Sequence, residues 1–514
     1  MKARIGSIRR LGATLVMSVF LVIGAATFKS KEWEIPKTWD ITAIEEAHLP
    51  PPDSTVKVEY APEAYYNALP EHVIYKTYPV YAQEYEPPGY LDSLRMLEPE
   101  VTFDLSKTKT QEDWIKAGEQ VFFWPASFSE IDNQFFSPID AEYLEGSGDR
   151  ITKDGVYPFI RYVIKEKGKV LRGDLSCANC HTRVTEAGEL IIGAQGNHTF
   201  DAGFGYTMKR FDIPAEIVNK GFYQLIETPW VHGLKEKVMA RTQEELMADL
   251  MASPPGIMSR QGMAYGLPLK VPSLIGLKDI KYLDNTGLMR HESPADLMRY
   301  AALNQGMDLL TSYDGFIPMG VNDFSEMPQP EEWDNAFGYE PYRYSDAQLY
   351  ALTQFIYSLE PPENPNQAPE ELLKKGEQIF IEQGCITCHT PPLYTNNMLT
   401  PVDGFEPPQE HLETYDIFNI SVETDPTTTL QSRRGTGYYK IPSLKGVWYQ
   451  GPFFHNGELA TLEDVLDPAR LQDDYVPTGF KPAGVVTKAV KGHDFGTHLS
   501  PEDKEALIAF LKSL

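Results

Sequence analysis

Cysteine is scarce in this sequence: four of the 514 residues are cysteines, and two pentapeptides, Cys177–His181 and Cys385–His389, contain them all. Their Cys-X-X-Cys-His pattern is the attachment signature of c-type haem. Each thiol adds to a haem vinyl group, and the histidine that follows is held where it can ligate the iron. A structural zinc site or a thioredoxin-like dithiol would each need a sequence context that is missing here. The sequence therefore predicts two covalently bound haem c groups.

Basic residues are also few. The 46 Lys and Arg residues face 73 Asp and Glu residues, which gives a net charge of −27. This balance argues against nucleic acid as a partner, because phosphates select basic surfaces. The negative field either steers a basic electron-donor protein, such as a small cytochrome or cupredoxin, or serves only solubility.

Charged residues are absent from Leu11 to Phe28, a run preceded by Arg9 and Arg10 and followed by Lys29. A charged start followed by an apolar segment is the form of an export signal. The run is also long enough for an uncleaved anchor. We therefore expect residues 1–28 to be a signal peptide or an N-terminal anchor. The protein would be periplasmic or secreted, and it would contact a membrane only through this segment, which could tether it to the inner membrane.

The chain repeats itself, and the repeat predicts its domains. Lys116–Phe122 matches Lys374–Phe380, and Val271–Gly276 matches Ile441–Gly446. At the offset of the second pair, Gly287 falls on Gly457.

Each half closes with an amphipathic segment, Ser345–Leu359 and Ser500–Leu514. Apolar residues recur at helical spacing in both segments, and a serine stands at each predicted N-cap. Each half therefore has the order helix, haem motif, Pro-Ser-Leu loop and closing helix. We expect a mainly α fold of two cytochrome c-like haem domains from an internal duplication, with long irregular loops.

Composition sets the predicted boundaries. Domain 1 spans residues 111–360 and domain 2 spans residues 369–514, with a proline-rich linker between them. Residues 29–110 are rich in Pro and Tyr with little periodicity. We expect an extended arm there, with disorder as the alternative.

The two halves differ in length around their haem motifs. Nine positions separate Gly376 from Cys385, whereas 59 separate Gly118 from Cys177, an insertion of about 50 residues. A second insertion covers about residues 199–270. The first insertion carries many aromatic residues, so we expect it to pack over haem 1: Phe122, Phe123, Trp124, Phe128, Phe135, Phe136 and Phe159. This asymmetry indicates that haem 1 carries out chemistry while haem 2 stores or relays electrons.

Several motifs of residues 111–514 resemble the bacterial di-haem cytochrome c peroxidase superfamily, which includes the MauG-type enzymes. They are Lys440–Val447, Phe453–Gly457, Ala460–Val465 and Phe510–Leu514. The ending Gly492–Gly496 and the first insertion are similar to a subgroup that contains the rubber oxygenases, secreted di-haem proteins that cleave polyisoprene with dioxygen.

The resemblance implies iron ligands. His181 would be the proximal ligand of the reactive haem 1, and His389 that of the six-coordinate, electron-transfer haem 2. Many peroxidases use a methionine as the second ligand of haem 2, but no methionine follows Met398. His493 matches the position of a second histidine ligand in the subgroup, with His498 and His455 as alternatives.

Other residues carry open alternatives. His455 lies in the Phe-His-Asn-Gly turn, where it would hydrogen-bond a haem propionate or fix the loop, or else pack in the core. His198 follows His181 by 17 positions. It is either a displaceable ligand that caps the iron of haem 1 or an ordinary loop histidine. Asn304 and Gln305 are candidate hydrogen-bond donors beside haem 1, and His291 is expected to be structural.

The family's first-domain turn often carries a tryptophan that bridges the haems, but Leu283 stands at that position. Trp448 or Tyr282 would have to substitute for it. The resemblance implies a peroxidase-like enzyme that uses H2O2 or O2 at haem 1. The alternatives are an oxygenase that acts on an apolar substrate and an electron-transfer cytochrome without a substrate. Calcium is a further possible cofactor that the sequence does not decide.

Overall fold

The computed structural model describes residues 33–131, 138–259, 262, 266–327 and 342–514. The predicted signal or anchor at residues 1–28 lies outside these ranges, as do Phe135 and Phe136 of the first insertion. Residues Ile35–Leu514 form one compact unit. The predicted division into an arm and two haem domains stays a prediction, because both haem motifs lie in this unit. No helix of the described residues is long and apolar enough to span a membrane.

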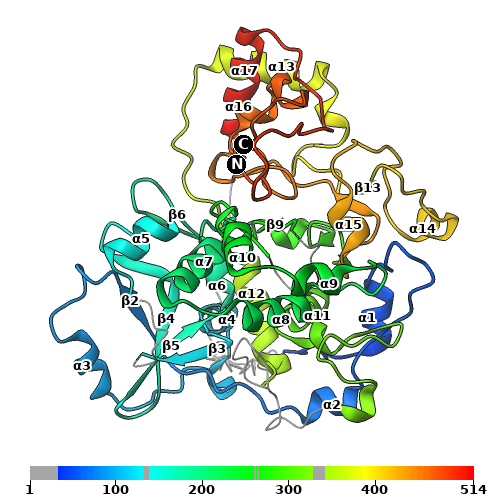
Figure 1. The fold of residues 1–514 in the computed structure, drawn as a ribbon. Helices are drawn as coiled ribbons and strands as arrows, with labels where there is room; N and C mark the ends of the chain where they lie inside the picture. The colour runs from blue at the N-terminus through cyan, green and yellow to red at the C-terminus, as the bar shows by residue number, and fades with distance from the viewer. Residues whose placement is uncertain (1–32, 132–137, 260–261, 263–265, 328–341) are drawn as a thin grey trace, which may run out of the picture. The chain divides into compact units, whose positions relative to one another are not determined.

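Two helix pairs frame the haem motifs (Figure 1). Helix α4 (Gln111–Phe122) packs against α12 (Asp346–Tyr357), and α13 (Glu370–Glu382) packs against α17 (Pro501–Ser513). In each half, the helix before the haem motif thus contacts the helix that closes the half. The prediction of a helix-rich fold is thus confirmed.

The closing helices begin where their serines predict. The Ser345 hydroxyl accepts a hydrogen bond from the backbone N–H of Gln348, and the Ser500 hydroxyl accepts one from that of Asp503. Each cap satisfies one of the backbone donors that a helix leaves unpaired at its start.

Each helix pair crosses at a glycine of the repeat. A Cβ atom on Gly118 would lie 1.9 Å from the carbonyl oxygen of Ala351, and one on Gly376 would lie 2.1 Å from that of Ala506. Both distances are far below van der Waals contact, so no side chain fits at either position. The shared glycine is therefore the residue that lets the two helices approach closely in both halves.

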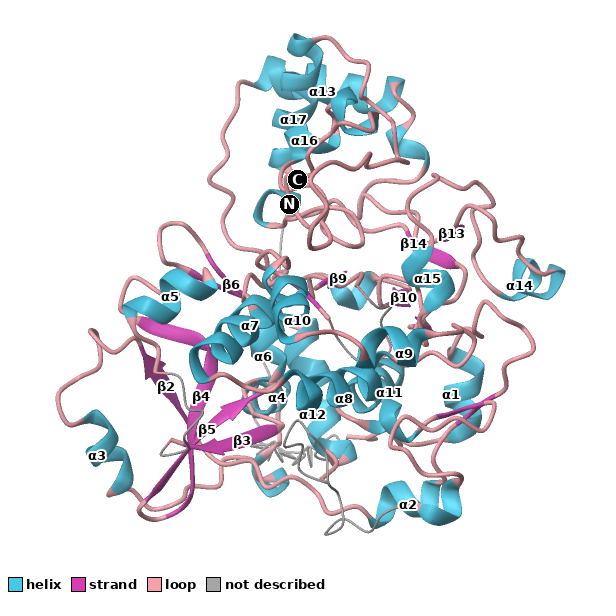
Figure 2. Cartoon of the chain, in the orientation of Figure 1, coloured by secondary structure: helices cyan, strands magenta, loops and turns pink. Residues whose placement is uncertain are grey.

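A four-stranded antiparallel sheet is the largest departure from the predicted α fold (Figure 2). Its strand order is β2 (Thr77–Tyr81), β4 (Val156–Glu166), β5 (Lys169–Asp174) and β3 (Ser127–Glu130). Strands β3, β4 and β5 come from the first insertion. Its β-branched and aromatic residues thus form a pleated layer with a buried face, where we expected a loop.

The second insertion is helical. It contains α7 (Phe200–Phe211), α8 (Ala215–Ile226), α9 (Leu234–Met239) and α10 (Gln243–Met251). Helix α10 packs against α7, and α9 packs against α8.

The described part of the segment predicted as an arm begins at Trp33 and contributes to the core. Strand β2 joins the sheet, β1 (Val58–Glu59) pairs with β12 (Ser312–Tyr313), and the side chains of Trp39 and Tyr66 are buried. The other helices here are α1 (Ile41–Ala47), α2 (Glu63–Ala68) and α3 (Tyr90–Arg95).

Short elements complete the described part of the chain. The helices are α5 (Ala141–Ser147), α6 (Cys177–Cys180), α11 (Pro294–Asn304), α14 (Gln409–Thr414), α15 (Thr427–Gln431) and α16 (Leu462–Val465). The strands pair as β6 (Thr182–Val184) with β7 (Leu190–Ile192), β8 (Ile257–Met258) with β9 (Leu269–Lys270), β10 (Tyr282–Leu283) with β11 (Met289–Arg290), and β13 (Leu399–Pro401) with β14 (Tyr438–Lys440). The 3-10 helices include η2 (Leu277–Asp279) and η6 (Cys385–Thr387).

Buried ion pairs join the two halves. Arg433 pairs with Asp308 and Arg434 pairs with Asp284, each at 3.1 Å. Breaking such a pair would leave an uncompensated buried charge, at a cost of roughly 3–5 kcal/mol. These contacts help to explain why the halves belong to one compact unit.

Candidate haem sites

The first haem motif follows strand β5, and its helix α6 packs against β4. Helix α6 is capped by Ser176, and the buried Asn179 inside the motif donates hydrogen bonds to the carbonyl oxygen of Phe159 and the carboxylate of Asp174, both at 3.0 Å. The first insertion therefore holds the motif through strands β4 and β5. Cys177, Cys180 and His181 all line a large cavity.

The repeated Pro-Ser-Leu loops orient the motif histidines. His181 Nδ1 lies 3.0 Å from the carbonyl oxygen of Pro272, and His389 Nδ1 lies 3.2 Å from that of Pro442 and 3.1 Å from that of Tyr394. A carbonyl can only accept, so Nδ1 carries the proton and Nε2 carries the lone pair that a metal needs. The equivalent prolines do the same task in both halves.

Apolar side chains of the second insertion line much of the first cavity. They include Phe200, Phe204, Phe222 and Leu225. The expectation that aromatic residues of the first insertion pack over haem 1 is wrong for those described, because Phe122, Phe123, Trp124, Phe128 and Phe159 are not among the lining residues. Phe122 lies in α4 instead, and Phe128 and Phe159 lie in strands β3 and β4.

Polar groups also face the first cavity. Asn304 and Gln305, the predicted donors, both line it, and the Asn304 side chain donates to the carbonyl oxygen of Tyr300 at 3.1 Å. Asp201, in the first turn of α7, was missed by the sequence reasoning. Its buried carboxylate accepts hydrogen bonds from Ser259 N–H at 2.7 Å and Ser253 Oγ at 3.2 Å, and burial raises its pKa to about 7.

A charged network from both halves reaches the same cavity. Arg434 and Asp284 line it, and the Tyr300 hydroxyl donates to Asp284 at 2.8 Å. Burial alone would raise the pKa of Asp284, but the Arg434 guanidinium and the Tyr300 hydroxyl hold it below its ordinary value. The second half of the chain therefore contributes to the first haem site.

His198 lies outside the group of described residues that line the first cavity. Its ring stacks on Phe159 with 4.6 Å between ring centres, and its Nδ1 lies 3.0 Å from the buried carboxylate of Asp149. Burial would lower the pKa of His198, but the Asp149 carboxylate raises it above the ordinary value. This placement favours the loop-histidine alternative.

The second cavity brings the rings of two histidines close together. Cys385, Cys388, His389 and His493 all line it. The ring centres of His389 and His493 are 6.3 Å apart, with an angle of 69° between the rings. A metal–imidazole bond is about 2 Å long, so two rings that ligate one ion from opposite sides have centres roughly 6 Å apart. The observed spacing matches that arrangement.

Arg470 fixes the loop of His493. Its fully buried guanidinium donates to the carbonyl oxygens of His493 at 2.7 Å, Gly492 at 3.0 Å and Val490 at 2.6 Å. Burial, aided by His389 and Arg470, lowers the pKa of His493 to about 4. The ring is therefore neutral at neutral pH, which is the form that binds a metal.

The two alternative ligands lie differently. His455 lines the second cavity, stacked on Tyr439 with 4.4 Å between ring centres, and its buried Nε2 has no hydrogen-bond partner. Burial lowers the pKa of His455 to about 4. His498 is exposed and is not among the described residues that line the cavity. A haem carboxyl group beside His455 would give its Nε2 a partner.

Lys270, Asn285 and Lys440 line both cavities. Burial lowers the pKa of each lysine to about 8, and Lys440 adds to the effect on Lys270. Haem propionates are the anions that such partly buried cations would accept. The sequence could have indicated these two lysines, because each stands two positions before the proline of a Pro-Ser-Leu repeat, in Lys270-Val271-Pro272 and Lys440-Ile441-Pro442.

The bridging residues considered from the sequence are placed elsewhere. Leu283 lines only the first cavity, and neither Trp448 nor Tyr282 is among the described residues that line either one. His291 donates from Nδ1 to the carbonyl oxygen of Ile280. No group of three or more His, Cys, Asp or Glu side chains suited to a metal occurs in the described ranges. The calcium expectation stays untested.

The residues that line each cavity fit haem c. Each provides two cysteines, a histidine with its Nδ1 proton held by a proline carbonyl, apolar walls, and the lysines at the shared boundary.

Comparisons with known proteins agree with this chemistry. A family model described as RoxA-like, cytochrome c-like matches residues 437–475. The chain is 27% identical over 157 residues to the cytochrome-c peroxidase IdrP2 of Denitromonas iodatirespirans, covering 27% of this chain and 39% of that protein. It is 24% identical over 174 residues to the cytochrome c peroxidase Ccp of Escherichia coli (strain K12), covering 32% of this chain and 31% of that protein.

These matches are partial, since the chain spans 31–39% of the length of the two curated relatives. A solved structure titled as Kuenenia stuttgartiensis hydrazine synthase aligns at 17% identity over 58% of this chain and 87% of that chain, with a TM-score of 0.29, which is too low to support an argument. The cytochrome c-like segment supports haem c as the cofactor. The predicted similarity to the di-haem cytochrome c peroxidase superfamily, with a RoxA-like segment in the second half, is thus confirmed.

Proposed function

We propose that the chain is an exported di-haem c-type oxidoreductase of the peroxidase kind. H2O2 or O2 would react at haem 1, attached at Cys177 and Cys180, and haem 2, attached at Cys385 and Cys388, would relay electrons. A small cytochrome or cupredoxin is the proposed electron donor. Export rests on the sequence of residues 1–28, with a charged start followed by an apolar run.

One observation carries this proposal: the two cavities differ in their histidines. Of the described residues that line the first cavity, His181 is the one histidine, whereas His389 and His493 face each other across the second. An iron held by one histidine keeps a coordination position for an oxidant, and an iron held by two does not. The first site is therefore suited to chemistry and the second to electron transfer.

Haem c, when bound, supplies the iron at which the O–O bond of the oxidant reacts. The chain supplies the surroundings. Pro272 holds the Nδ1 proton of His181, and the phenylalanines of α7 and α8 exclude water. The carboxyl group of Asp201, with a pKa of about 7, can take a proton from H2O2 and return it at neutral pH. Asn304 and Gln305 offer amide groups that can orient a bound oxidant.

Turnover of H2O2 with reduced cytochrome c tests the proposal. We expect oxidation of the cytochrome that requires H2O2 and stops when His181 is replaced by Gly. A variant with His498→Ala, which changes an exposed histidine, should keep wild-type turnover. Turnover that persists after His181 is replaced, or the absence of turnover in the wild type, contradicts the peroxidase proposal.

A second candidate function is an oxygenase that cleaves an apolar substrate. The apolar walls of the first cavity, with Phe200, Phe204, Phe222 and Leu225, favour it, as does the RoxA-like match. Oxygen-dependent cleavage of an olefin such as squalene or polyisoprene, without added reductant, would support this alternative. Product formation that needs H2O2 and a reductant would support the peroxidase.

The third candidate is an electron-transfer cytochrome without a substrate. It requires both irons to be closed to small ligands. A Soret band that neither cyanide nor H2O2 changes, in the ferric and in the half-reduced protein, would support it against both enzymes.

A further inference from the structure

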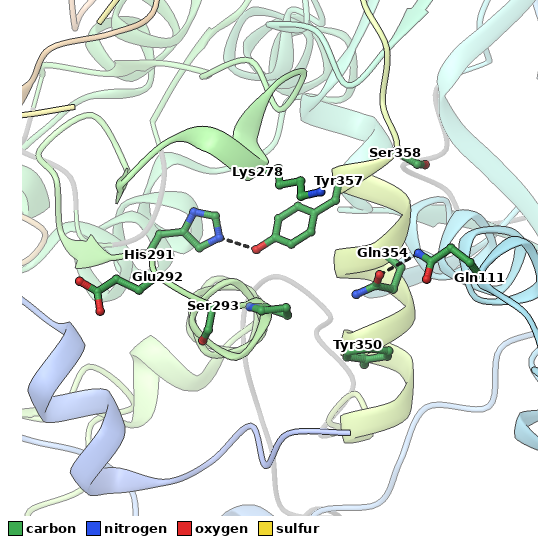
Figure 3. A pocket seen from close by; sticks show the side chains of 10 residues that line it. Gln111, Lys278, His291, Glu292, Ser293, Tyr350, Gln354, Tyr357 and Ser358 are labelled. Atoms are coloured by element: carbon green, nitrogen blue, oxygen red, sulfur yellow. Dashed lines mark hydrogen bonds between the residues drawn. The ribbon is translucent and has the colours of Figure 1, made fainter. Parts of the chain in front are cut away.

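A surface pocket lies beside the first haem cavity (Figure 3). It is lined mainly by polar and aromatic side chains: Gln111, Lys278, His291, Glu292, Ser293, Tyr350, Gln354, Tyr357 and Ser358. None of these residues has a role in the haem sites described above. Within the pocket, the Tyr357 hydroxyl points at the ring of His291, and the oxygen lies 2.5 Å from Nε2.

The hydrogen bonds of His291 fix the direction of that contact. Nδ1 lies 2.6 Å from the carbonyl oxygen of Ile280, which can only accept, so Nδ1 carries the ring proton. Nε2 is then the acceptor, and the Tyr357 hydroxyl is the donor. Burial lowers the pKa of His291, which keeps the ring neutral, and burial raises the pKa of Tyr357, which keeps the phenol protonated. The pair is a phenol held on a neutral base.

Residues that are adjacent in the sequence line this pocket and the first haem cavity. Ile356 lines the haem cavity and the next residue, Tyr357, lines the pocket. Leu277 and Lys278 divide in the same way. Helix α12 therefore has one face, with Leu352 and Ile356, toward the haem and another toward the pocket, as the helical spacing of three and four residues requires.

We propose that Tyr357 and His291 form a redox-active pair that carries oxidising equivalents from haem 1 to a small polar reductant in this pocket. The inference rests on the proposed reaction of peroxide at haem 1. It adds a second point of electron entry, separate from the route through haem 2.

The electrons and protons of the step balance. In this proposal Tyr357 would supply one of the two electrons that reduction of H2O2 to two waters requires. Haem 2 would supply the other electron, and solvent would supply the two protons. The hydroxyl proton of Tyr357 moves to His291 Nε2, so a neutral tyrosyl radical and an imidazolium form. A one-electron reductant in the pocket then returns the electron, and His291 returns the proton. The carbonyl oxygen of Ile280 keeps the ring in place throughout.

Electron paramagnetic resonance after addition of H2O2 tests the pair. We expect a tyrosyl signal in the wild type, which ring-deuterated tyrosine narrows, and loss of that signal in Tyr357→Phe. In His291→Gln the radical should be lost or shifted in hyperfine structure, because the proton acceptor has changed. Tyr350→Phe is the matched control: Tyr350 lines the same pocket but packs edge-on against Trp114, and its replacement should keep the signal.

Ascorbate is the probe for the reductant. It should shorten the life of the wild-type radical, and a lifetime that ascorbate leaves unchanged overturns the pocket as an entry point.

The outcomes separate this inference from the proposed function. If H2O2 changes the Soret band but Tyr357→Phe keeps the tyrosyl signal, or no tyrosyl signal forms, the pair is overturned and the peroxidase stands. If H2O2 leaves the Soret band unchanged, the peroxidase proposal fails, and the redox pair fails with it.

Discussion

The two haem cavities share equivalent residues around the motif histidine but differ in the residues that lie opposite it. Each has a Cys-X-X-Cys-His motif, a proline carbonyl on the histidine and a lysine before that proline. In the second cavity His493 lies near His389, and Arg470 holds the backbone of His493 in place. In the first, helices α7 and α8 contribute phenylalanines and the carboxyl group of Asp201. In the proposed function, the role of each cavity would depend on the residues that lie opposite its motif histidine.

Removing His493 should have the largest effect on this difference. His493→Ala takes away the residue that faces His389, so one low-spin ferric signal should become high-spin while both haems stay attached. Electron paramagnetic resonance and a pyridine haemochrome assay measure the two properties. His498→Ala is the matched control, because His498 is exposed and should leave the spectrum unchanged. An unchanged spectrum in His493→Ala would remove it as a ligand.

Replacing Asp201 should weaken the chemistry of the first site alone. Asp201→Asn removes a group that takes a proton from H2O2 as its carboxylate, so the reaction of H2O2 with the ferric protein should slow about 10²-fold. Because the pKa of Asp201 is about 7, the wild-type rate should rise as the pH passes upward through about 7, and the variant should lose that rise.

Glu227→Gln supplies the control for Asp201. Burial also raises the pKa of Glu227 to about 7, but Glu227 is not among the described residues that line the first cavity. Stopped-flow rates across pH should therefore match the wild type. If the Asp201 variant keeps the wild-type pH profile, Asp201 has no part in proton transfer.

Neutralising the shared lysines should have the smallest effect, and it should reach both sites. A nearby cation favours the ferrous state, so Lys270→Met and Lys440→Met should each lower the two reduction potentials by tens of millivolts. Lys445→Met, an exposed lysine five positions from Lys440, should change neither. Spectroelectrochemical titration measures both steps, and a shift in one step alone would contradict the shared position.

The sequence predicted the features whose chemistry is local. The haem motifs need no tertiary contact to be recognised, and Ser345 and Ser500 cap helices through hydrogen bonds within their own first turns. The glycines of the repeat, Gly118 and Gly376, likewise recur where two helices cross. His493 was predicted through a family resemblance, and the structure places it opposite His389.

Features set by distant contacts were left open or missed. The sequence left His198 as either a ligand or a loop histidine, and its contact with Asp149, 49 positions earlier, favours the loop histidine. The position of Asp201 depends on the packing of α7 and on Ser259, far along the chain. The sheet was a different case, because Val156–Glu166 and Lys169–Asp174 show strand-forming residues around Gly168 that could have been recognised.

Cyanide titration of the diferric protein tests the central claim most directly, because cyanide binds only an iron with an accessible coordination position. With electron paramagnetic resonance separating the two haems, the account predicts that one cyanide binds per chain. The signal of haem 1 would change, and the low-spin signal of haem 2 would stay. Binding at both haems or at neither would contradict the claim that one cavity is open and the other is closed by His493.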